Sequence, residues 1–456
     1  MKKVIALLLA LVMVFSLVAC GAKEEAPADA PATETPAEKP AETPAEAPAD
    51  DKEREDVVVE CYTVKTENLE AWETLEERFE ELYPWVDIEL ITLEFSSGGD
   101  EFINSRIAAG NLPDLLQISQ GDRTRTMIDE GQIMDLSGFE VANNIPEVYR
   151  DLLTYNDCLF GLAQGAAFAT MYYNMEILGE AGWDRVPENW DEMIQCLQDI
   201  QDKTDAAPIV TSGLHSTLIY FLIDLLAGNV AGDELGVGGY EELFKNGEFD
   251  FTAYPEITEK LGQIAPYFIT GAASMSEDDC ATVMGEGLAG MCLAGNWTAA
   301  SICSAIAECT GDEALVAASL PPFNAPGKQV WISVAPEDGF GITNDPNRSA
   351  DEQEAVELFF NWLYQPENFC VIQNSSGSVP VLTTMTEDQI VLPAAIVPVV
   401  APMNAAPSVL MGFNIFTAEY SSAANIALMD LVSGNATAEQ TVQLLWEAEQ
   451  NYPLNP

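Results

Sequence analysis

The sequence predicts an α/β protein whose globular part forms two lobes, each built on a parallel sheet. Two observations predict this fold class. Candidate strands and helices alternate at the start of the globular region, and strand–helix–strand units favour right-handed crossovers between parallel strands. In addition, about 400 residues follow residue 56, whereas a single core stops growing near ~250–300 residues, so two lobes are expected.

The alternating elements begin at residue 56. Residues 56–64 contain three consecutive valines and predict a buried strand. Apolar residues recur every three or four positions over 69–82, which indicates one face of a helix. Residues 86–93 alternate in polarity and predict a second strand. A short helix is expected over 102–110, and a third strand over 115–118.

An export segment precedes this region. Lys2 and Lys3 are followed by an uncharged apolar run of about 14 residues, Val4–Leu17. The run is too short to span a ~30 Å hydrocarbon core, so residues 1–19 are predicted to be a signal peptide. The small residues before Cys20 resemble a bacterial lipobox, which implies that Cys20 is lipidated and becomes the mature N-terminus. The alternative is an ordinary secreted protein with a chance cysteine.

Residues 20–55 are predicted to be a disordered tether behind the lipidated cysteine. From Ala22 to about Glu55 the chain consists almost entirely of Ala, Pro, Glu, Asp and Thr, a composition that cannot bury a core. Spaced prolines and like charges favour an extended, semi-rigid chain. We expect this segment to hold the globular part away from the membrane, unless it is a tail whose length has no role.

The charge balance excludes one class of partner. The formal net charge is −56, from 74 acidic and 18 basic residues. Nucleic acid is excluded because its phosphates require Lys and Arg. We interpret the acidity as a solvated extracellular surface, with a field that attracts cationic ligands as the alternative.

No pattern predicts catalysis, a metal or a cofactor. His215 is the only histidine, so any Ser-His-Asp, Cys-His or His-ligated metal site would have to use it. Gly285–Gly290 matches Gly-x-Gly-x-x-Gly, but a dinucleotide loop follows a strand and opens a helix, and this segment is expected to do the reverse. The eight cysteines after Cys20 form no Cys-x-x-Cys. We interpret them as buried thiols, with four disulfides as the alternative.

Later in the chain, no segment is typical of a transmembrane helix. The longest apolar stretch, 390–413, is interrupted by four prolines. Proline breaks helices, so an extended segment at the surface is expected there.

A series of short motifs resembles one protein family. Ala108–Leu115 resembles the "Gly-x-x-Pro-Asp-(apolar)" signature of bacterial extracellular solute-binding proteins, family 1, the receptors of ABC importers that include maltodextrin-binding protein. Phe79–Pro84 resembles the family's "Phe-Glu-x-x-Tyr-Pro", and Met284–Trp297 its "Gly-x-Ala-(Ala/Gly)-Met-x-x-x-Gly-x-Trp". Further matches follow in the family's order at 130–136, 160–163, 171–174, 179–192, 355–373 and 377–381.

The resemblance implies a clamshell like that of periplasmic binding proteins, with two α/β lobes joined by hinge strands. It implies a first lobe of 56–163 plus 319–345, and a second lobe of 164–318 plus 346–456. Ligand would lie between the lobes, at the carboxyl ends of the strands. The sequence departs from the family pattern at 156–158, at Ala163 and in the apolar segment 164–170, so the resemblance implies the fold and leaves the ligand class open.

Residues at strand ends are the candidate ligand contacts. Tyr62, Glu94, Gln120 and Asp122 follow or end the first three predicted strands, where a parallel sheet would bring them to one edge. Carboxylates and amides there could bond to hydroxyl groups. Tyr62 packing between sheet and helix, and Asp122 as a helix cap, are the alternatives.

Three candidates belong to the second lobe. Asn296 and Trp297 follow the predicted strand 290–294, and a tryptophan there could lie flat against a sugar ring. A core position is the alternative for Trp297. Tyr420, ahead of a long helix, is placed only by its position in the family.

The function predicted from these features is that of a membrane-anchored extracellular receptor of an ABC importer, not an enzyme. We expect a monomer on the outer face of the membrane, which captures a mono- or oligosaccharide and delivers it to the permease. The alternatives are a cationic or peptidic solute in the same fold, or a surface glycoside hydrolase, which needs two carboxylates about 5–10 Å apart.

Overall fold

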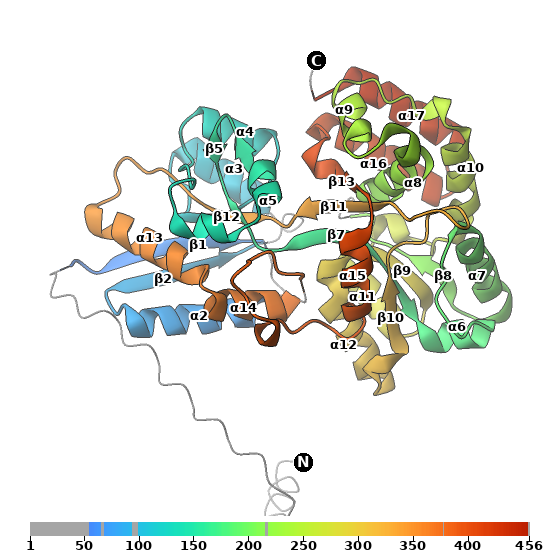
Figure 1. The fold of residues 1–456 in the computed structure, drawn as a ribbon, viewed down its shortest axis with the longest axis horizontal. Coiled ribbons are helices and arrows are strands. Elements are labelled where there is room, and N and C mark those ends of the chain that lie inside the picture. Colours follow the sequence, from blue (N-terminus) through green and yellow to red (C-terminus); the bar gives the residue numbers. More distant parts are fainter. Residues whose placement is uncertain (1–53, 65–67, 94–98, 215–217, 377, 455–456) are drawn as a thin grey trace, which may run out of the picture. The chain divides into compact units, whose positions relative to one another are not determined.

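A computed structural model describes residues 54–454 except 65–67, 94–98, 215–217 and 377. The predicted signal peptide, Cys20 and nearly all of the tether lie outside these residues. Within them, two larger sheets organise the chain (Figure 1). We call the parts built on them the first lobe and the second lobe. Among the described residues, no helix has the length and apolar character needed to span a bilayer.

The first sheet has the strand order β2-β1-β3-β12-β6. Its strands are β1 (Val57–Thr63), β2 (Val86–Thr92), β3 (Leu115–Ile118), β6 (Leu162–Ala163) and β12 (Gly339–Ile342). Strand β1 runs parallel to β2 and β3. The predicted strands at 56–64, 86–93 and 115–118 are therefore confirmed, as is their parallel arrangement.

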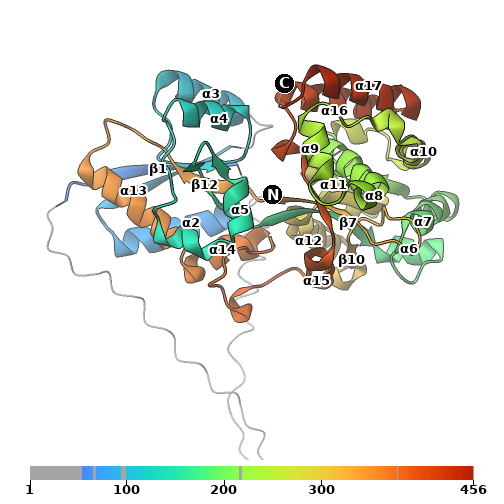
Figure 2. The same cartoon turned by 45° about the horizontal axis from the view of Figure 1, so that its top comes forward.

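Helices cover both sides of this sheet (Figures 1 and 2). They are α2 (Leu69–Leu82), α3 (Gly99–Ala109), α4 (Asp122–Asp129), α5 (Glu147–Leu152), α13 (Ala350–Leu363) and α14 (Pro366–Ser376). Phe79 of α2 makes an edge contact with Phe359 of α13, and their ring centroids are 4.9 Å apart. Tyr62 of β1 stacks on Phe102 of α3 at 5.5 Å. Because side chains alternate along a strand, neighbouring residues of β1 face different helices.

The C-terminal part of the first lobe differs from the predicted division. The resemblance implies a second lobe that includes 346–456 and therefore α13 and α14. Their buried residues instead join the apolar cluster of β1–β3 and α2, through Phe359, Phe360, Tyr364 and Phe369. Conversely, β11 (Ile332–Pro336), assigned to the first lobe, pairs with β7 of the second sheet. The first core therefore contains residues from 57–166 and 340–382.

The second sheet has the order β13-β11-β7-β9-β8, with β10 also paired to β7. Its remaining strands are β7 (Ala166–Asn174), β8 (Ala207–Val210), β9 (Ala289–Gly295), β10 (Val316–Ser319) and β13 (Ser408–Leu410). All nine residues of β7 are buried. Met171 and Tyr173 belong to one apolar cluster, and Tyr172 to another. Both faces of β7 are therefore covered, as its continuous run of small and apolar residues indicates.

Most of the helices within the described residues belong to the second lobe (Figure 1). They are α6 (Met175–Ala181), α7 (Trp190–Lys203), α8 (Asp224–Leu235), α9 (Gly239–Lys245), α10 (Pro255–Ile264), α11 (Glu277–Gly285), α12 (Ala299–Thr310), α15 (Val397–Ala405), α16 (Ala418–Val432) and α17 (Ala438–Asn451). Helix α15 lies in the stretch 390–413, where the sequence predicts an extended segment. Pro398 is tolerated in its first turn, where no backbone N–H is needed, whereas Pro402 lies inside the helix. The remaining short strands, β4 (Thr154–Tyr155) and β5 (Cys158–Leu159), form a hairpin.

Two strands run against their neighbours, so both sheets are mixed rather than purely parallel. Strand β12 is antiparallel to β3, and β7 is antiparallel to β9. Each begins where its antiparallel partner ends: Gly339 pairs with Ile118, and Ala169 pairs with Gly295. Both strands follow connectors from the other sheet, so they enter at the carboxyl edge and run opposite to the strands that finish there.

Candidate functional site

Two connectors of two residues each join the carboxyl edges of the sheets. Gln164 and Gly165 lead from β6 to β7, and Glu337 and Asp338 lead from β11 to β12. The backbone N–H of Glu337 donates to the carbonyl of Gly165 at 2.8 Å, so the two connectors are bonded to each other. Because the connectors are short and bonded to each other, they hold the carboxyl edges of the two sheets close together.

The connectors are tightly packed. A Cβ atom added to Gly165 would lie 2.4 Å from Oε2 of Glu337 and 3.0 Å from the carbonyl oxygen of Val379, so a larger residue would force these groups to shift. The other carboxylate oxygen of Glu337 accepts a 2.9 Å bond from Ser378, which is fully buried. Ala166 also donates to the carbonyl of Val379. A third segment, 378–379, thus contacts the second connector and the first residue of β7.

At the edge of the first sheet, polar side chains bond mainly to one another. The hydroxyl of Thr63 donates to Oε1 of Gln117 at 2.6 Å, and the backbone N–H of Val64 donates to the same oxygen at 3.0 Å. Both side chains are buried. This bonding fixes the end of β1 against β3.

Tyr62 is also buried, which contradicts its predicted contact with a ligand. The side chain has no exposed surface, and its hydroxyl donates to the carbonyl of Leu93 at 3.1 Å. Its ring faces α3, where it stacks on Phe102. The position fits the alternative that Tyr62 packs between sheet and helix.

The other candidates of the first lobe follow β2 and β3. Gln120 is half-buried just after β3. Asp122 is the first residue of α4, and Gly121 occupies the N-cap position that was the alternative for Asp122. Gln120 and Asp122 remain predicted ligand contacts. Glu94 lies outside the described residues.

In the second lobe, Asn296 has a structural position. Its side chain is fully buried. The amide oxygen accepts from the backbone N–H of Phe168 at 2.8 Å, and the amide nitrogen donates to the carbonyl of Ala166 at 3.0 Å. Both ends of the amide therefore satisfy backbone groups of β7, and the side chain offers a ligand no surface.

The next residue, Trp297, is only half-buried. It lies in the 3₁₀ turn Asn296–Thr298 that follows β9. Its indole nitrogen donates to both carboxylate oxygens of Glu277, each at 3.1 Å. Phe221 is a tilted neighbour at 6.1 Å between ring centroids. The ring thus combines a partly exposed surface with a fixed polar edge. Trp297 remains a predicted ligand contact.

Tyr420, predicted only from family position, lies inside the second lobe. It is fully buried in α16, where its ring packs against Phe244 at 4.8 Å and Phe416 at 4.6 Å. Burial raises the pKa of its hydroxyl, and the nearby carboxyl groups of Glu449 and Asp224 raise it further. An interior ring cannot contact a solute, so this assignment is corrected.

Glu277 was not identified by sequence reasoning. It is half-buried in the first turn of α11, twenty residues before its partner Trp297. No sequence pattern indicates that Glu277 is a partner of Trp297, because only the packing of α11 on β9 brings the two side chains together. His215 lies outside the described residues. No group of three or more His, Cys, Asp or Glu side chains within the described part of the chain is arranged to hold a metal ion.

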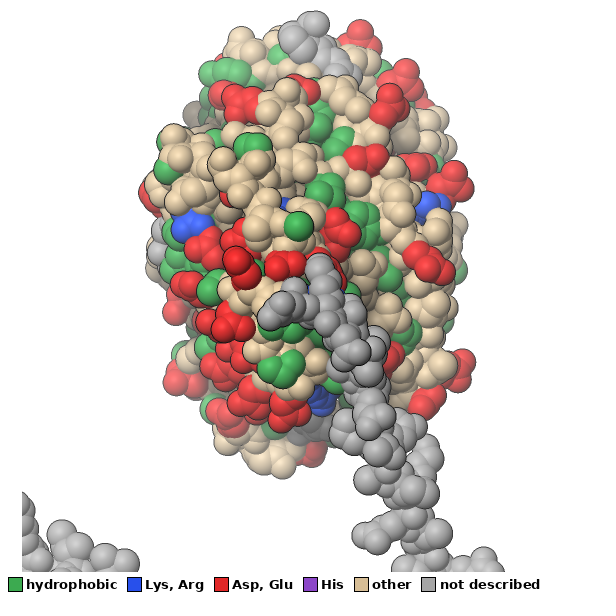
Figure 3. All heavy atoms as spheres, turned by 90° about the vertical axis from the view of Figure 1, so that its left-hand side faces the viewer, with side chains coloured by type: hydrophobic (Ala, Val, Ile, Leu, Met, Phe, Trp, Pro, Cys, Tyr) green, Lys and Arg blue, Asp and Glu red, His purple; other side chains and the backbone are tan. Residues whose placement is uncertain are grey.

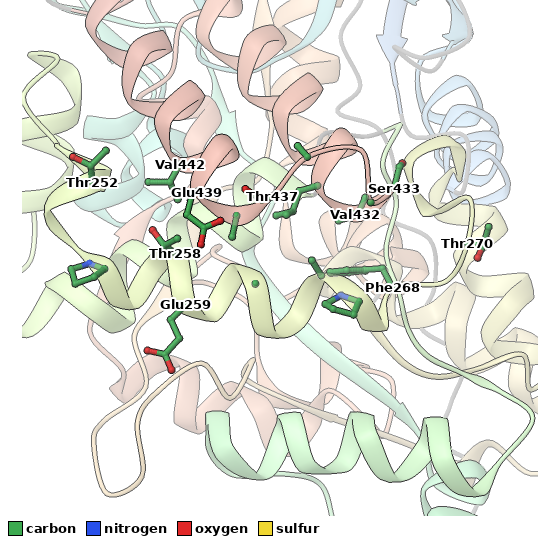
Figure 4. Close-up of a pocket in the computed structure, with 18 of the residues that line it drawn as sticks. Thr252, Thr258, Glu259, Phe268, Thr270, Val432, Ser433, Thr437, Glu439 and Val442 are labelled. Carbon is green, nitrogen blue, oxygen red and sulfur yellow. The ribbon is translucent and has the colours of Figure 1, made fainter.

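A groove lies elsewhere on the second lobe, between α10 and the α16–α17 pair (Figure 4). Its volume is about 1270 Å³. Threonine, serine, proline and the carboxylates Glu259 and Glu439 line it, and Phe268 is its one aromatic residue among those described. None of the predicted ligand residues borders it. Sugar recognition favours a flat aromatic surface, so the edge near Trp297 is the better candidate site.

The surface of the first lobe is acidic, as the composition predicts. Asp and Glu side chains gather on the face drawn in Figure 3. Carboxyl groups also lie close together along α2, where the pKa of Glu76 is raised by partial burial and then by repulsion from Glu80 and Asp87. Such a face disfavours a polyanionic partner.

Comparison with known proteins identifies the family. Residues 63–368 match the sequence profile of the family of bacterial extracellular solute-binding proteins. A curated relative, the multiple sugar-binding protein of Streptococcus mutans, is 22% identical over 158 residues, which are 34% of this chain and 36% of that protein. The chain thus matches just over a third of that relative's length.

Solved structures share the fold. RafE in complex with raffinose superposes with a TM-score of 0.71 at 16% identity, and the match covers 88% of this chain and 100% of RafE. Maltose-bound MalE3 of T. maritima gives 0.68 at 16% identity over 87% of this chain and 99% of MalE3. The two-lobed α/β fold and its family are those of binding proteins rather than enzymes. The chain belongs to the family 1 bacterial extracellular solute-binding proteins.

Proposed function

We propose that this protein captures a mono- or oligosaccharide outside the cell and delivers it to the permease of an ABC importer. The observation that carries the proposal is Trp297, a half-buried indole at the carboxyl edge of the second sheet. Proteins that share this fold bind sugars, among them RafE, which was solved with raffinose, and MalE3, which was solved with maltose. These complexes support a carbohydrate as the solute.

An indole suits this role for a physical reason. The faces of a sugar ring carry C–H groups, and a flat aromatic face covers them without losing many rotamers on binding. Carboxylate and amide groups nearby bond to the hydroxyls at the ring's edge. Gln120, just after β3, supplies such a group.

Capture follows from the connectors. Lobe closure needs backbone rotation in a few residues at the ends of elements, and 164–165 and 337–338 are short segments of this kind. A solute that contacts both lobes only when they are closed favours the closed form by the free energy of those extra contacts. The permease can then distinguish loaded receptor from empty receptor, and the solute stays chemically unchanged.

A thermal-shift screen tests the proposal. Saccharides are compared with amino acids, polyamines and short peptides. A true ligand at 100 times its dissociation constant should stabilise the protein by ~2.7 kcal/mol. Stabilisation by saccharides alone supports the proposal. Stabilisation by polyamines alone would favour the cationic alternative, for which the carboxylate of Glu277 beside an aromatic ring is a suitable arrangement.

Trp297→Ala locates the site. The substitution should remove most of the ligand-induced stabilisation and change the stability of the free protein little. Trp183→Ala is the matched control, because Trp183 is also half-buried in the second lobe and its indole nitrogen donates to Asp199 at 2.9 Å. If Trp297→Ala destabilises the free protein severely, the ring belongs to the core. New reducing ends after incubation with glycans would instead indicate a glycoside hydrolase.

We further propose that Cys20 anchors the protein to the outer face of the membrane. The apolar run before Cys20 and the proline-rich segment after it support this. Two or more acyl chains anchor a protein stably, whereas a single chain holds it marginally. Cys20→Ala should release the protein from cells, as measured by its partition between membrane and medium. Retention of this variant in the membrane fraction would contradict the anchor.

A further inference from the structure

We infer that Glu277 is a positioning residue, which fixes the plane of the Trp297 indole so that its free surface is ready for a ligand. The inference rests on the proposed function and adds a residue to its site. It begins with the bond between the two side chains, in which the indole N–H lies 3.1 Å from each oxygen of the carboxylate. A hydrogen bond to an ionised carboxylate is stronger than one between neutral groups, so it holds the donor more firmly.

The strand beneath the ring supplies the second constraint. A Cβ atom added to Gly295 would lie 2.4 Å from three carbons of the Trp297 ring, Cη2, Cζ2 and Cζ3. Contact with three ring atoms at one distance means that the benzene part of the indole lies flat over the backbone of Gly295. Glycine thus provides the space for the ring's inner face, and Glu277 fixes the ring's polar edge.

Glu277 is itself held in place by its helix. Ser276 caps α11 and forms a capping box with Asp279: its hydroxyl accepts from the backbone N–H of Asp279 at 3.1 Å, and its own N–H donates to that carboxylate at 2.9 Å. Glu277 is the first residue after this cap. The helix is packed on β9 through Cys280 and Met284, which share an apolar cluster with Cys292. The carboxylate therefore projects from a rigid base.

Two physical effects follow for binding. A ring already held in its bound orientation loses little conformational freedom when a ligand arrives, and such preorganisation increases affinity. The negative charge at the ring's edge also reinforces the negative potential of its face, which attracts the partly positive C–H groups of a sugar. Both effects pass through Trp297, so the inference requires no direct contact between Glu277 and the ligand.

A double-mutant cycle tests this route. With a saccharide that the screen identifies, Glu277→Ala should weaken binding by up to about tenfold. Glu277→Gln keeps a carbonyl acceptor at the same reach and should restore most of the affinity. Trp297→Phe keeps an aromatic ring but removes the N–H, so adding Glu277→Ala to it should cause no further loss. The inference would be overturned if Glu277→Ala lowered the affinity equally in the wild type and in Trp297→Phe, because Glu277 would then act on the ligand directly.

A measurement without ligand separates this inference from the proposed function. The emission of Trp297 is obtained as the difference between wild type and Trp297→Phe, and acrylamide quenching reports the exposure of its ring. In the Glu277→Ala background the difference emission should shift to the red and be quenched more strongly. Asp199→Ala removes the carboxylate partner of Trp183. This control should leave the emission and the quenching of Trp297 unchanged. An unaltered Trp297 emission in Glu277→Ala overturns the positioning role, even if saccharides bind. Failure of every saccharide to bind overturns the proposed function instead.

Discussion

The carboxyl edges of the two sheets present their side chains in opposite ways. At the first edge, Thr63 and Gln117 are buried and bonded to each other. At the second edge, Asn296 is buried and Trp297, the next residue, remains half-exposed. A side chain inside a strand has its direction set by the pleat, whereas the first turn beyond a strand can direct a side chain outward. Ligand contacts are therefore better sought one or two residues after a strand than at its last residue.

The largest expected effect tests the structural half of this comparison. Asn296→Ala leaves the N–H of Phe168 and the carbonyl of Ala166 buried without their partner. Each buried unpaired group costs ~1–3 kcal/mol, so the free energy of unfolding should fall by about 4 kcal/mol. Urea denaturation measures the change. Asn435→Ala, at an exposed position in the same lobe, is the control and should change stability little. A similarly small effect of Asn296→Ala would mean that its two bonds are not structural.

The two lobes differ in how they hold carboxyl groups that are partly or fully buried. In the first lobe, Asp114 is paired with Arg348 at 2.7 Å. Burial raises the pKa of Asp114, and the guanidinium partly opposes the shift. In the second lobe, Glu449 is fully buried and accepts from the N–H of Phe249, while its second oxygen has no partner among the described residues. Burial raises the pKa of Glu449 to about 9, and the nearby Asp250 adds to the rise.

This difference predicts a pH dependence. Between the ordinary glutamate pKa and about 9, folded Glu449 keeps its proton and the unfolded chain releases it. The unfolded state then binds fewer protons, so stability falls as pH rises, by up to about 1.4 kcal/mol per pH unit. Glu449→Gln should therefore flatten the fall between pH ~6 and ~8 in urea denaturation. Glu447→Gln, exposed on the same helix, should leave the slope unchanged. An unchanged slope in Glu449→Gln would contradict the shifted pKa.

The smallest expected effect concerns the first edge. Tyr62→Phe removes the bond to the carbonyl of Leu93 and keeps the ring stacked on Phe102. The free energy of unfolding should fall by about 1 kcal/mol. Calorimetric titration with a saccharide should give unchanged affinity, because the tyrosine is buried. A clear loss of affinity would restore Tyr62 as a ligand contact and remove the contrast between the two edges.

The first lobe's strands could be predicted because their patterns are local. The alternation in 86–93 and the apolar spacing of 69–82 correspond to β2 and α2. The lobe to which α13 belongs could not be predicted from such patterns, because its amphipathic face fits either sheet. Only the contact between Phe359 and Phe79, far apart in the sequence, decides the matter.

The site was predictable to a smaller extent. Trp297 was placed correctly after a strand, but Asn296 was not recognised as a backbone partner, since that depends on the neighbouring β7. The burial of Tyr420 could have been read from its helix. Tyr420, Ala424, Leu428 and Leu431 recur at helical spacing and form the buried face of α16. Glu277 left no sequence signal, because its partner belongs to a different element.

The division of the first core between two distant stretches of chain affects how the protein is made. The cluster that contains Phe79 also contains Phe359 and Leu382. A ribosome must therefore synthesise nearly the whole polypeptide before this core can be completed, and contacts so distant in sequence form slowly because a long loop must close first. Until then the nascent chain stays incompletely folded. A polypeptide that has to be threaded through a translocation pore before it folds gains time from this delay.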